Sequence, residues 1–287
     1  QPIRYLKANS LGTAALYETL LKEPHLRKVV KKIIVASSKT IYGEGAYDCR
    51  EHGLVYPGLR PLKQLESGDW EVHCPICSED LKPVGITEEK SPQNLSVYAL
   101  SKYDVERLAL MYGETMNIPS IALRYFSAYG PRQSLSNPYS GVCAIFISRL
   151  MNGEPPVIFE DGGQLRDFIY VEDIAKATLL ALEKGQNTDY YNVGSGVPSS
   201  INQLAEMLAE LFGSSIEPEL SNDFRVGDTR SDFADIAKIT RAFGFKPTWS
   251  LKKGLNKLVE WSVDKSAIDR FEESVARSRV FFGGGGR

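Results

Sequence analysis

Strand-like and helix-like segments alternate along this chain, and this alternation constrains the fold more than any other feature. Three short runs are continuous, apolar and rich in β-branched or aromatic residues: "KKIIVASS" (31–38), "SIALRYF" (120–126) and "YYNVGSG" (190–196). Such runs are typical of strands buried on both faces of a parallel sheet. Segments with a helical pattern lie around them, at 9–23, 96–116, 141–153, 171–185 and 200–213. The alternation predicts an α/β fold with a mainly parallel sheet flanked by helices.

Local signals refine this pattern. Gly185 follows a predicted helix and is expected to be its C-cap, whereas Ser200 is expected to be the N-cap of the next helix. Two short strands are expected at 155–160 and 166–171. Residues 44–95 interrupt the alternation, because they are rich in Gly, Pro, Cys and charged residues and show little periodicity.

The composition excludes several classes of protein. A net charge of −2 over 287 residues offers no basic field for nucleic acid and no polybasic patch for a membrane surface. No apolar run approaches the roughly 18–20 residues of a membrane-spanning helix. Four cysteines are too few for a disulfide scaffold in a chain of this length. We therefore expect a cytoplasmic globular protein that binds neither nucleic acid nor a membrane, with a flexible Gly-rich tail at 279–287.

A candidate catalytic group stands at the start of the helix predicted at 96–116. Tyr98 and Lys102 are four residues apart, so their side chains lie on one face of that helix. A neighbouring cation stabilises a phenolate and lowers the tyrosine pKa from its ordinary value of about 10. Ser37 and Ser38 end the first predicted strand, where open α/β sheets bind their ligands. Taken alone, Tyr98 and Lys102 are also compatible with an ordinary surface pair.

The interrupted region carries a candidate metal site. Cys49 and His52 are separated by two residues, as are Cys74 and Cys77. Paired spacings of this kind are typical of a closed, tetrahedral structural zinc site. His73 is the alternative fourth ligand, and thiols that bind no metal are the other alternative. The last cysteine, Cys143, is expected to be a small core residue.

Seven segments carry a resemblance to a known family. They are "ANSLGT" (8–13), "SSKTIYG" (37–43), "SVYALSK" (96–102), "LRYFSAYGPRQ" (123–133), "QLRDFIYVEDIAKA" (164–177), "NVGSG" (192–196) and "RVGDTRSDFAD" (225–235). In type and order they resemble the extended short-chain dehydrogenase/reductase family, in its branch of NAD-dependent nucleotide-sugar epimerases and dehydratases. The resemblance covers nearly the whole chain.

The resemblance implies a Rossmann-type parallel sheet flanked by helices and a smaller C-terminal α/β substrate domain. Residues 1–133 correspond to the remainder of the NAD-binding domain, with a zinc-ribbon-like insertion at 44–88. Residues 134–278 correspond to the sugar-nucleotide-binding part, with segments that return to the Rossmann domain. The family's Gly-rich loop and ribose-binding acid precede the segment "ANSLGT" and are expected to lie outside this chain. The choice between NAD and NADP as the cofactor therefore stays open.

The resemblance also implies roles for individual residues. Tyr98 corresponds to the catalytic base, Lys102 to the residue that lowers its pKa and holds the nicotinamide ribose, and Ser38 to the hydroxyl that holds the substrate oxygen. The positions that correspond to NAD contacts are Asn9, Ser37, Tyr98, Lys102, Tyr125 and Phe126.

The positions that correspond to contacts with the nucleotide sugar are Ser38, Ser127, Val142, Phe159, Gln164, Arg166, Arg225 and Asp228. Arg166 and Arg225 match residues that hold the diphosphate, which suits the planar donors of guanidinium. Asp228 matches an acid near the nucleotide ribose, and Phe159 is expected to pack on the base. Ser127 departs from the Asn that is usual there and puts one phosphate contact in doubt. Arg166 could instead pair with Asp167 or Asp173, and Phe159 could be a core residue.

The resemblance implies epimerisation at C4 of a nucleoside-diphosphate sugar, with UDP- or dTDP-sugars expected. In such enzymes Tyr removes the proton of the 4-hydroxyl, hydride passes to NAD, and the 4-keto sugar turns before hydride returns. Family dehydratases carry Asp-Glu where this chain has Lys39 and Thr40, so elimination is disfavoured. A reductase, dehydrogenase or decarboxylase of the same family remains an alternative, as does a non-catalytic relative that binds NAD(P) or a sugar nucleotide.

Two further features follow from the resemblance. Family members dimerise through the helix that bears Tyr98 and the helix that precedes 31–38, so a homodimer is expected. The insertion suggests a subgroup near the dTDP-L-rhamnose 4-epimerases. Because it lies between Ser38 and Tyr98, we expect it to form a wall or lid of the sugar pocket or a subunit contact.

Overall fold

A computed structural model describes residues 2–137, 141–273 and 275–276. The predicted tail at 279–287 lies outside these residues. The central sheet is parallel, in the order β1 (Ile33–Ser38), β5 (Ser120–Tyr125) and β9 (Asp189–Val193). Within the described ranges β1 pairs on one side only. The predicted α/β class and the three strands of the sheet are confirmed.

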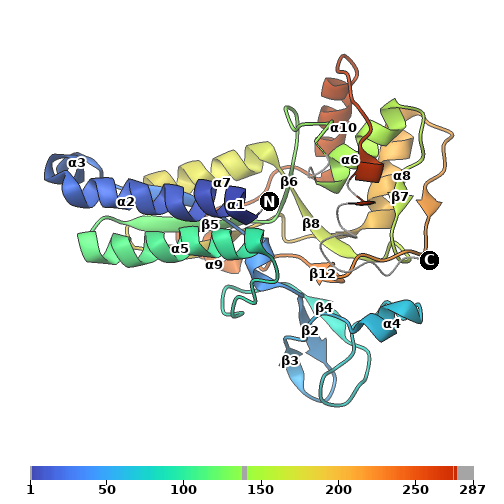
Figure 1. The fold of residues 1–287 in the computed structure, drawn as a ribbon, viewed down its shortest axis with the longest axis horizontal. Coiled ribbons are helices and arrows are strands. Elements are labelled where there is room, and N and C mark those ends of the chain that lie inside the picture. Colours follow the sequence, from blue (N-terminus) through green and yellow to red (C-terminus); the bar gives the residue numbers. More distant parts are fainter. Residues whose placement is uncertain (1, 138–140, 274, 277–287) are drawn as a thin grey trace.

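Helices cover both faces of this sheet (Figure 1). The helix α5 (Val97–Met116) packs on β1 and β5, and α7 (Val171–Lys184) lies on the other face. The alternation of side chains along β5 shows this division: Arg124 bonds to Glu106 of α5, whereas Tyr125 bonds to Thr178 of α7. Gly185 is the C-cap of α7, as predicted. Its φ of −64° is not left-handed; a Cβ there would lie 2.0 Å from Ile121 Cδ1, so close packing explains the glycine.

The first helical region begins earlier than predicted. It comprises α1 (Pro2–Tyr5), a π-helical turn η1 (Leu6–Leu11), α2 (Gly12–Lys22) and α3 (Pro24–Val29), so the predicted start at residue 9 is wrong. Pro2 suits a first helical turn because its missing N–H would have no intrahelical partner there. The side chains that face α5 and the sheet are Tyr17 and Leu20, which are buried.

A second group of elements packs around its own apolar core. A mixed sheet contains β10 (Pro198–Ser200), β8 (Leu165–Tyr170) and β12 (Ser231–Asp232), and β6 (Ser127–Tyr129) also pairs with β8. A separate pair joins β7 (Val157–Ile158) to β11 (Glu219–Leu220). The helices α6 (Val142–Met151), α8 (Ile201–Phe212) and α10 (Leu251–Ser262) contribute to this core, while α9 (Ala237–Phe243) packs on β9.

Ser200 forms a capping box at the start of α8, which confirms the predicted N-cap. Within the residues described, no helix combines the length and apolar character needed to cross a membrane.

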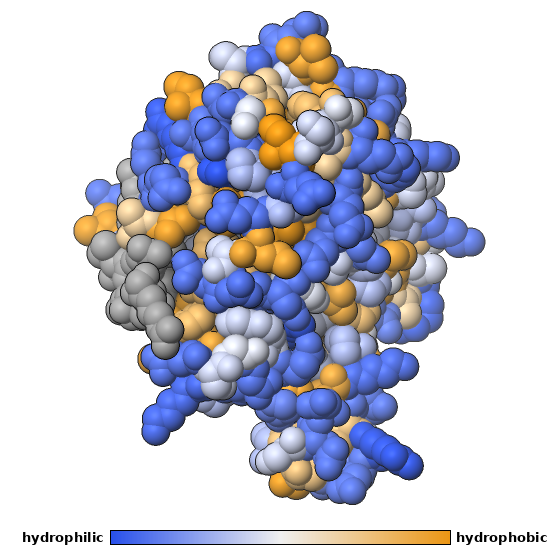
Figure 2. Space-filling view, turned by 90° about the vertical axis from the view of Figure 1, so that its right-hand side faces the viewer, coloured by the Kyte–Doolittle hydropathy of each residue, from blue (hydrophilic) through white to orange (hydrophobic). Residues whose placement is uncertain are grey.

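The insertion forms a small separate lobe below β12 (Figures 1 and 2). After the 3₁₀ turn η2 (Lys39–Tyr42), β2 (Ala46–Cys49) pairs antiparallel with β3 (Gly53–Val55) and β4 (Lys82–Val84), and α4 (Leu62–Glu66) lies between β3 and β4 in the chain. Its core is small, and its buried members are Tyr47, Cys49, Val72, Cys74 and Leu81.

Candidate active site

Ser38, Tyr98 and Lys102 meet at the carboxyl end of β1. Ser38 is the last residue of β1, and the Tyr98 hydroxyl forms a hydrogen bond with it. Ser96 caps α5 by accepting a backbone hydrogen bond at 3.0 Å, which places Tyr98 in the first turn and Lys102 in the second. The Lys102 Nζ donates to the Ala36 carbonyl oxygen of β1 at 2.6 Å. The spacing of Tyr98 and Lys102 therefore directs both side chains toward one strand.

The pKa of Tyr98 differs from the sequence-based expectation. Burial raises the pKa of Tyr98 above its ordinary value, and the hydrogen bond with Ser38 only partly opposes this. Lys102 does not produce the expected lowering, because its ammonium group is directed to Ala36 and burial lowers its own pKa. The Ser38 oxygen accepts from the Thr40 hydroxyl at 3.0 Å, so its own O–H is available to the Tyr98 oxygen.

Asn9 and Ser37 form hydrogen bonds near this site. Asn9 lies in the π-helical turn η1 and donates to the Ser101 hydroxyl of α5 at 2.9 Å. Single π-helical turns within helices are frequent at functional sites. Ser37 is buried and donates to a Glu106 carboxylate oxygen at 2.9 Å. Both side chains therefore help to fix α5 against its neighbours.

The two aromatic residues at the end of β5, Tyr125 and Phe126, face the interior. The Tyr125 hydroxyl lies 2.7 Å from Thr178 Oγ1, and Phe126 is part of the main apolar core. Lys102 offers the clearest fit to a dinucleotide. Its ammonium group carries three donors, and among the described residues only the Ala36 carbonyl oxygen accepts one of them. The remaining donors suit ribose hydroxyls.

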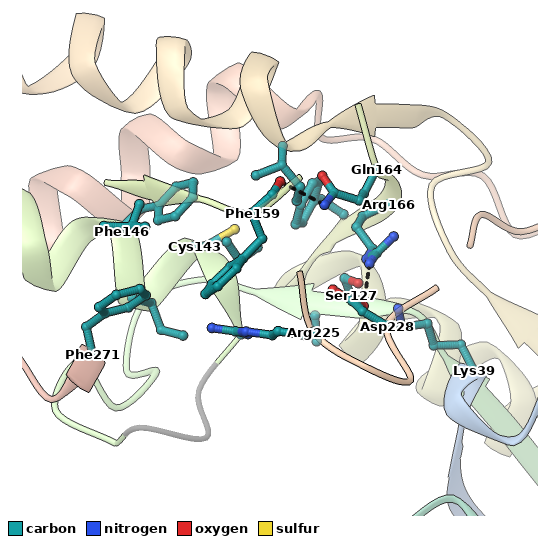
Figure 3. A pocket seen from close by; sticks show the side chains of 17 residues that line it. Lys39, Ser127, Cys143, Phe146, Phe159, Gln164, Arg166, Arg225, Asp228 and Phe271 are labelled. Carbon is teal, nitrogen blue, oxygen red and sulfur yellow. Dashed lines mark hydrogen bonds and ion pairs between the residues drawn. The ribbon is translucent and has the colours of Figure 1, made fainter. Parts of the chain in front are cut away.

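A cavity of about 370 Å³ begins at Lys39, directly after Ser38 at the end of β1 (Figure 3). It lies between the mixed sheet, the start of α6 and the segment before β12. All the predicted substrate residues except Ser38 line it, namely Ser127, Val142, Phe159, Gln164, Arg166, Arg225 and Asp228. The fold thus brings together side chains from five separate parts of the sequence.

The apolar end of the cavity pairs an arginine with an aromatic ring. The guanidinium carbon of Arg225 lies 4.2 Å from the centroid of Phe159, and the two are neighbours in Figure 3. Burial lowers the pKa of Arg225, and its Nε atom has no partner among the described residues. Gln164 donates to the Phe159 carbonyl oxygen at 2.9 Å and so fixes the backbone beside the ring. Phe159 is half-buried and lines the cavity instead of filling the core.

Arg166 is held at the polar end of the cavity. Its Nη2 donates to Asp228 Oδ1 at 2.8 Å, and its Nε lies 3.4 Å from Asp232 Oδ2. The alternative pairing with Asp167 or Asp173 is wrong, because those carboxylates accept hydrogen bonds from other residues. Burial opposes ionisation of Asp228, but the charges of Arg166, Arg225, Lys39 and Arg60 together outweigh it and lower the pKa of Asp228. A cavity with this charge pattern suits a diphosphate joined to a polar sugar and an aromatic base.

The four predicted metal ligands converge in the insertion. Their ligand atoms all lie within 4.8 Å of one another. The Cys49 sulfur is 3.7 Å from the Cys77 sulfur and 3.5 Å from His52 Nδ1, and Cys74 Sγ is 3.7 Å from the same nitrogen. His73, the alternative ligand, points elsewhere, because its ring nitrogens lie 2.7 Å from Asp69 and 2.9 Å from Asp80.

Comparison with known proteins identifies the family. Residues 78–194 match the model of the NAD dependent epimerase/dehydratase family. A dTDP-L-rhamnose 4-epimerase of Burkholderia thailandensis is 32% identical over 260 residues, which are 90% of this chain and 69% of the relative. The chain belongs to the NAD-dependent epimerase/dehydratase family. This confirms the branch that the sequence motifs indicate.

Solved structures agree with this assignment. A UDP-glucose 4-epimerase of Thermotoga maritima, with UDP-glucose, aligns at a TM-score of 0.71 and 31% identity, covering 91% of this chain and 71% of that one. A UDP-glucuronic acid 4-epimerase of Bacillus cereus, with UDP-glucuronic acid and NAD, aligns at 0.67 and 26% identity, covering 88% and 66%. The match to the family model begins at residue 78, directly after Cys77.

Sequence reasoning missed several residues that line this cavity. Lys39 lines the cavity and forms an ion pair with Asp232. From the sequence, Lys39 was noted only because it replaces an acid of the family's dehydratases. Its position directly after Ser38 could have indicated that Lys39 lies near the site. Phe271 lies 6.2 Å from Phe159 between ring centroids, and no motif marks it. Cys143 is buried, as predicted, and also lines the cavity.

Proposed function

We propose that this chain carries the catalytic and substrate-binding residues of an NAD-dependent enzyme that inverts C4 of a nucleoside-diphosphate sugar. The observation that carries the proposal is the meeting of Ser38, Tyr98 and Lys102 at the end of β1, next to a cavity lined by Arg166 and Arg225. Membership of the epimerase family and the named 4-epimerases among its relatives support it.

Tyr98 acts as the base in this proposal. Ser38 holds the sugar 4-oxygen, Tyr98 takes its proton, and a 4-keto sugar forms. After the sugar turns in the pocket, Tyr98 returns the proton to the oxygen at the inverted centre. Bound NAD would supply the acceptor for the C4 hydride, the source of the same hydride when the 4-keto sugar is reduced and, through its charged ring, a field that favours the phenolate. Lys102 would hold its ribose, and the raised pKa of Tyr98 means that the base needs such a positive charge near neutral pH.

The cavity anchors the nucleotide while the sugar turns. Arg225 and Arg166 bind the diphosphate, Phe159 packs on the base, and Asp228 accepts a hydrogen bond from the ribose. Such anchoring at a distance from the reacting carbon allows rotation of the sugar without loss of the substrate. We propose a UDP- or dTDP-sugar as the substrate, in keeping with the relatives' names.

The residues after Ser38 disfavour dehydration. Lys39 is engaged with Asp232, and Thr40 donates to Ser38. Neither is a carboxylic acid that could protonate a leaving hydroxyl at C6.

Incubation of the full-length protein with NAD and a panel of UDP- and dTDP-sugars tests this function. We expect inversion at C4, seen by nuclear magnetic resonance, without accumulation of NADH. Stoichiometric consumption of added NADH would instead identify a reductase, and release of carbon dioxide a decarboxylase.

We also propose that Cys49, His52, Cys74 and Cys77 bind one structural zinc ion. Zn–S bonds of about 2.3 Å and Zn–N bonds of about 2.0–2.1 Å in a tetrahedron give S–S edges of about 3.8 Å and S–N edges of about 3.6 Å. The separations of 3.7 and 3.5 Å between these ligand atoms support that geometry. Four protein ligands leave no open position, so the ion would stabilise the fold and take no part in catalysis. Elemental analysis should find one zinc per chain; its absence from freshly purified protein would refute the site.

A homodimer and a cytoplasmic location complete the proposal. Apolar side chains on η1 and α5 are exposed, among them Leu11 at 61% and Met111 at 49%. Neighbouring helices with such faces can bury them against a second copy. The four cysteines form no disulfide, which is compatible with a reducing compartment. We retain the division at residues 133 and 134, with α7, β9 and α9 packing on the first part.

A further inference from the structure

The insertion contacts the cavity wall through buried charges, and these contacts go beyond a role in local stability. Arg60, between β3 and α4, has a side chain that is 2% exposed. It donates from Nη1 to Glu160 Oε2 at 2.7 Å and from Nη2 to Glu160 Oε1 at 2.9 Å. A bidentate pair of this kind fixes both orientation and distance. One end of the contact belongs to the insertion and the other to the residue that follows Phe159.

Glu160 is held in an unfavourable backbone conformation. Its φ is +56°, in the left-handed region that non-glycine residues seldom adopt. Its backbone N–H donates to the Asp223 carbonyl oxygen at 2.7 Å. Strained residues of this kind persist only where the surrounding contacts hold them. Because Phe159 is adjacent, the Arg60 contact also determines where that ring lies in the cavity.

The same arginine reaches the other side of the cavity. Its Nη2 donates to the Asp228 carbonyl oxygen at 3.2 Å, and the Asp228 carboxylate holds Arg166. Arg60 therefore connects the Phe159 loop and the turn at 225–228, which carry the stacked Arg225 and Phe159.

Arg230 makes a second contact between the insertion and the region of the cavity wall. The Arg230 guanidinium binds Glu71 of the insertion and, from Nη1, Asp161 Oδ1 at 2.6 Å. Its backbone N–H donates to Glu44, a fully buried carboxylate at the start of the insertion. The chain that leaves the insertion then pairs with 233–235 through Ile86. Arg230 thus joins the insertion to Asp161, two residues after Phe159 in the cavity lining.

The position of Arg60 depends on the insertion. Its Nη1 also donates to the Trp70 carbonyl oxygen at 2.9 Å, and the Trp70 ring lies 6.3 Å from Phe224, next to Arg225. With so few buried apolar side chains, the insertion has little other than the four metal ligands to keep this backbone in place.

We propose that the insertion, with its metal bound, positions the nucleotide-binding wall of the cavity, and that Arg60 is the positioning residue. This inference rests on the proposed function and on the proposed metal. Arg60 does not touch the substrate; it keeps Phe159, Arg225 and Asp228 in the arrangement that a nucleoside diphosphate requires.

Calorimetric titration of the full-length protein with UDP and with dTDP tests the inference. Arg60→Met should weaken binding about tenfold, within the range usual for coupling between sites, while zinc content stays at one per chain. Arg60→Lys should recover part of the affinity. Lys63→Met, which removes an exposed cation from the same lobe, should bind as the unaltered protein does. Unchanged affinity in Arg60→Met would overturn the inference, and so would equal losses in both methionine variants.

A double-mutant cycle separates positioning from general damage. Cys74→Ser should lower zinc content and weaken UDP binding about tenfold in the unaltered background, but less than about twofold in Arg60→Met. Independent, additive losses would show that the metal does not act through Arg60 and would overturn the inference. If Arg60→Met does not fold, Glu71→Gln at the exposed second contact should still weaken binding about threefold at full zinc occupancy, and an unchanged affinity would count against positioning. Failure of the unaltered protein to bind either nucleotide would refute the proposed function itself and, with it, the inference.

Discussion

The central sheet and the insertion are adjacent in the chain, yet different forces hold them together. The sheet lies in a core of many fully buried apolar side chains, including Ile121, Leu123 and Val193. The insertion's own apolar cluster has five buried residues, of which two are proposed metal ligands. Burial of apolar area at roughly 25 cal/mol per Å² can maintain the first region but not a lobe of this size.

This difference matters for function. Ser38 and Tyr98 are carried by a strand and a helix that apolar packing holds rigidly, as proton transfer between fixed groups requires. The cavity wall that we propose to bind the nucleotide depends instead on buried charges and, in the same proposal, on the metal-bound insertion. Four predictions test whether chemistry and substrate positioning are separated in this way.

The largest effect is expected for Tyr98→Phe. Loss of the base should lower kcat by about 10²-fold to 10⁴-fold, which is the usual contribution of general base catalysis. The Kd for UDP, measured by calorimetry, should change less than twofold because the cavity is intact. Tyr103→Phe, one turn further along α5, is the matched control and should retain near-normal turnover. Substantial activity in Tyr98→Phe would show that another group is the base.

Removal of the metal should affect the two regions unequally. After chelation, hydrogen exchange at 46–84 should become fast, because binding of a structural metal supplies much of the folding free energy of such a lobe. Exchange in β5 and β9 should stay slow. Equal acceleration in the sheet would mean that the two regions unfold as one unit.

Leu123→Ala should destabilise the central sheet and leave the insertion unaffected. Leu123 is fully buried in β5, so the truncation should reduce the free energy of unfolding by about 3 kcal/mol, as for other buried leucines. Denaturant titration provides the measurement, and Leu179→Ala, at a residue that is 53% exposed, provides the control. Zinc content should not change in either variant. Loss of zinc from Leu123→Ala would argue that the lobe depends on the sheet.

The smallest effect is expected for Ser38→Ala. The Ser38 hydrogen bond lowers the pKa of Tyr98 against the effect of burial, so its removal raises that pKa further. The phenolate fraction at neutral pH then falls, so the rising limb of the kcat profile should move to higher pH, with rate lost near neutral pH and recovered at higher pH. A uniform loss at every pH would indicate that Ser38 acts only by holding the substrate.

Local sequence rules predicted much of this arrangement. The four-residue spacing of Tyr98 and Lys102 placed both on one helical face, and the end of a β-branched run placed Ser38 beside them. The paired two-residue spacings predicted a cluster of Cys49, His52, Cys74 and Cys77, whose ligand atoms lie within 4.8 Å of one another. These rules succeed because they depend on helix and strand geometry over a few residues, which neighbouring parts of the fold scarcely alter.

Tertiary packing decided the rest. The sequence determined that a tyrosine, a lysine and a serine could meet, but burial determined that the pKa of Tyr98 rises. The sequence offered both His52 and His73 as ligands, and the structure separated them: His52 lies with the three cysteines, whereas His73 pairs with Asp69 and Asp80. The contact of Arg60 with Glu160 spans 100 residues and follows no spacing rule. Desolvation and long-range ion pairs depend on what the whole chain places around a side chain, and no local pattern records that.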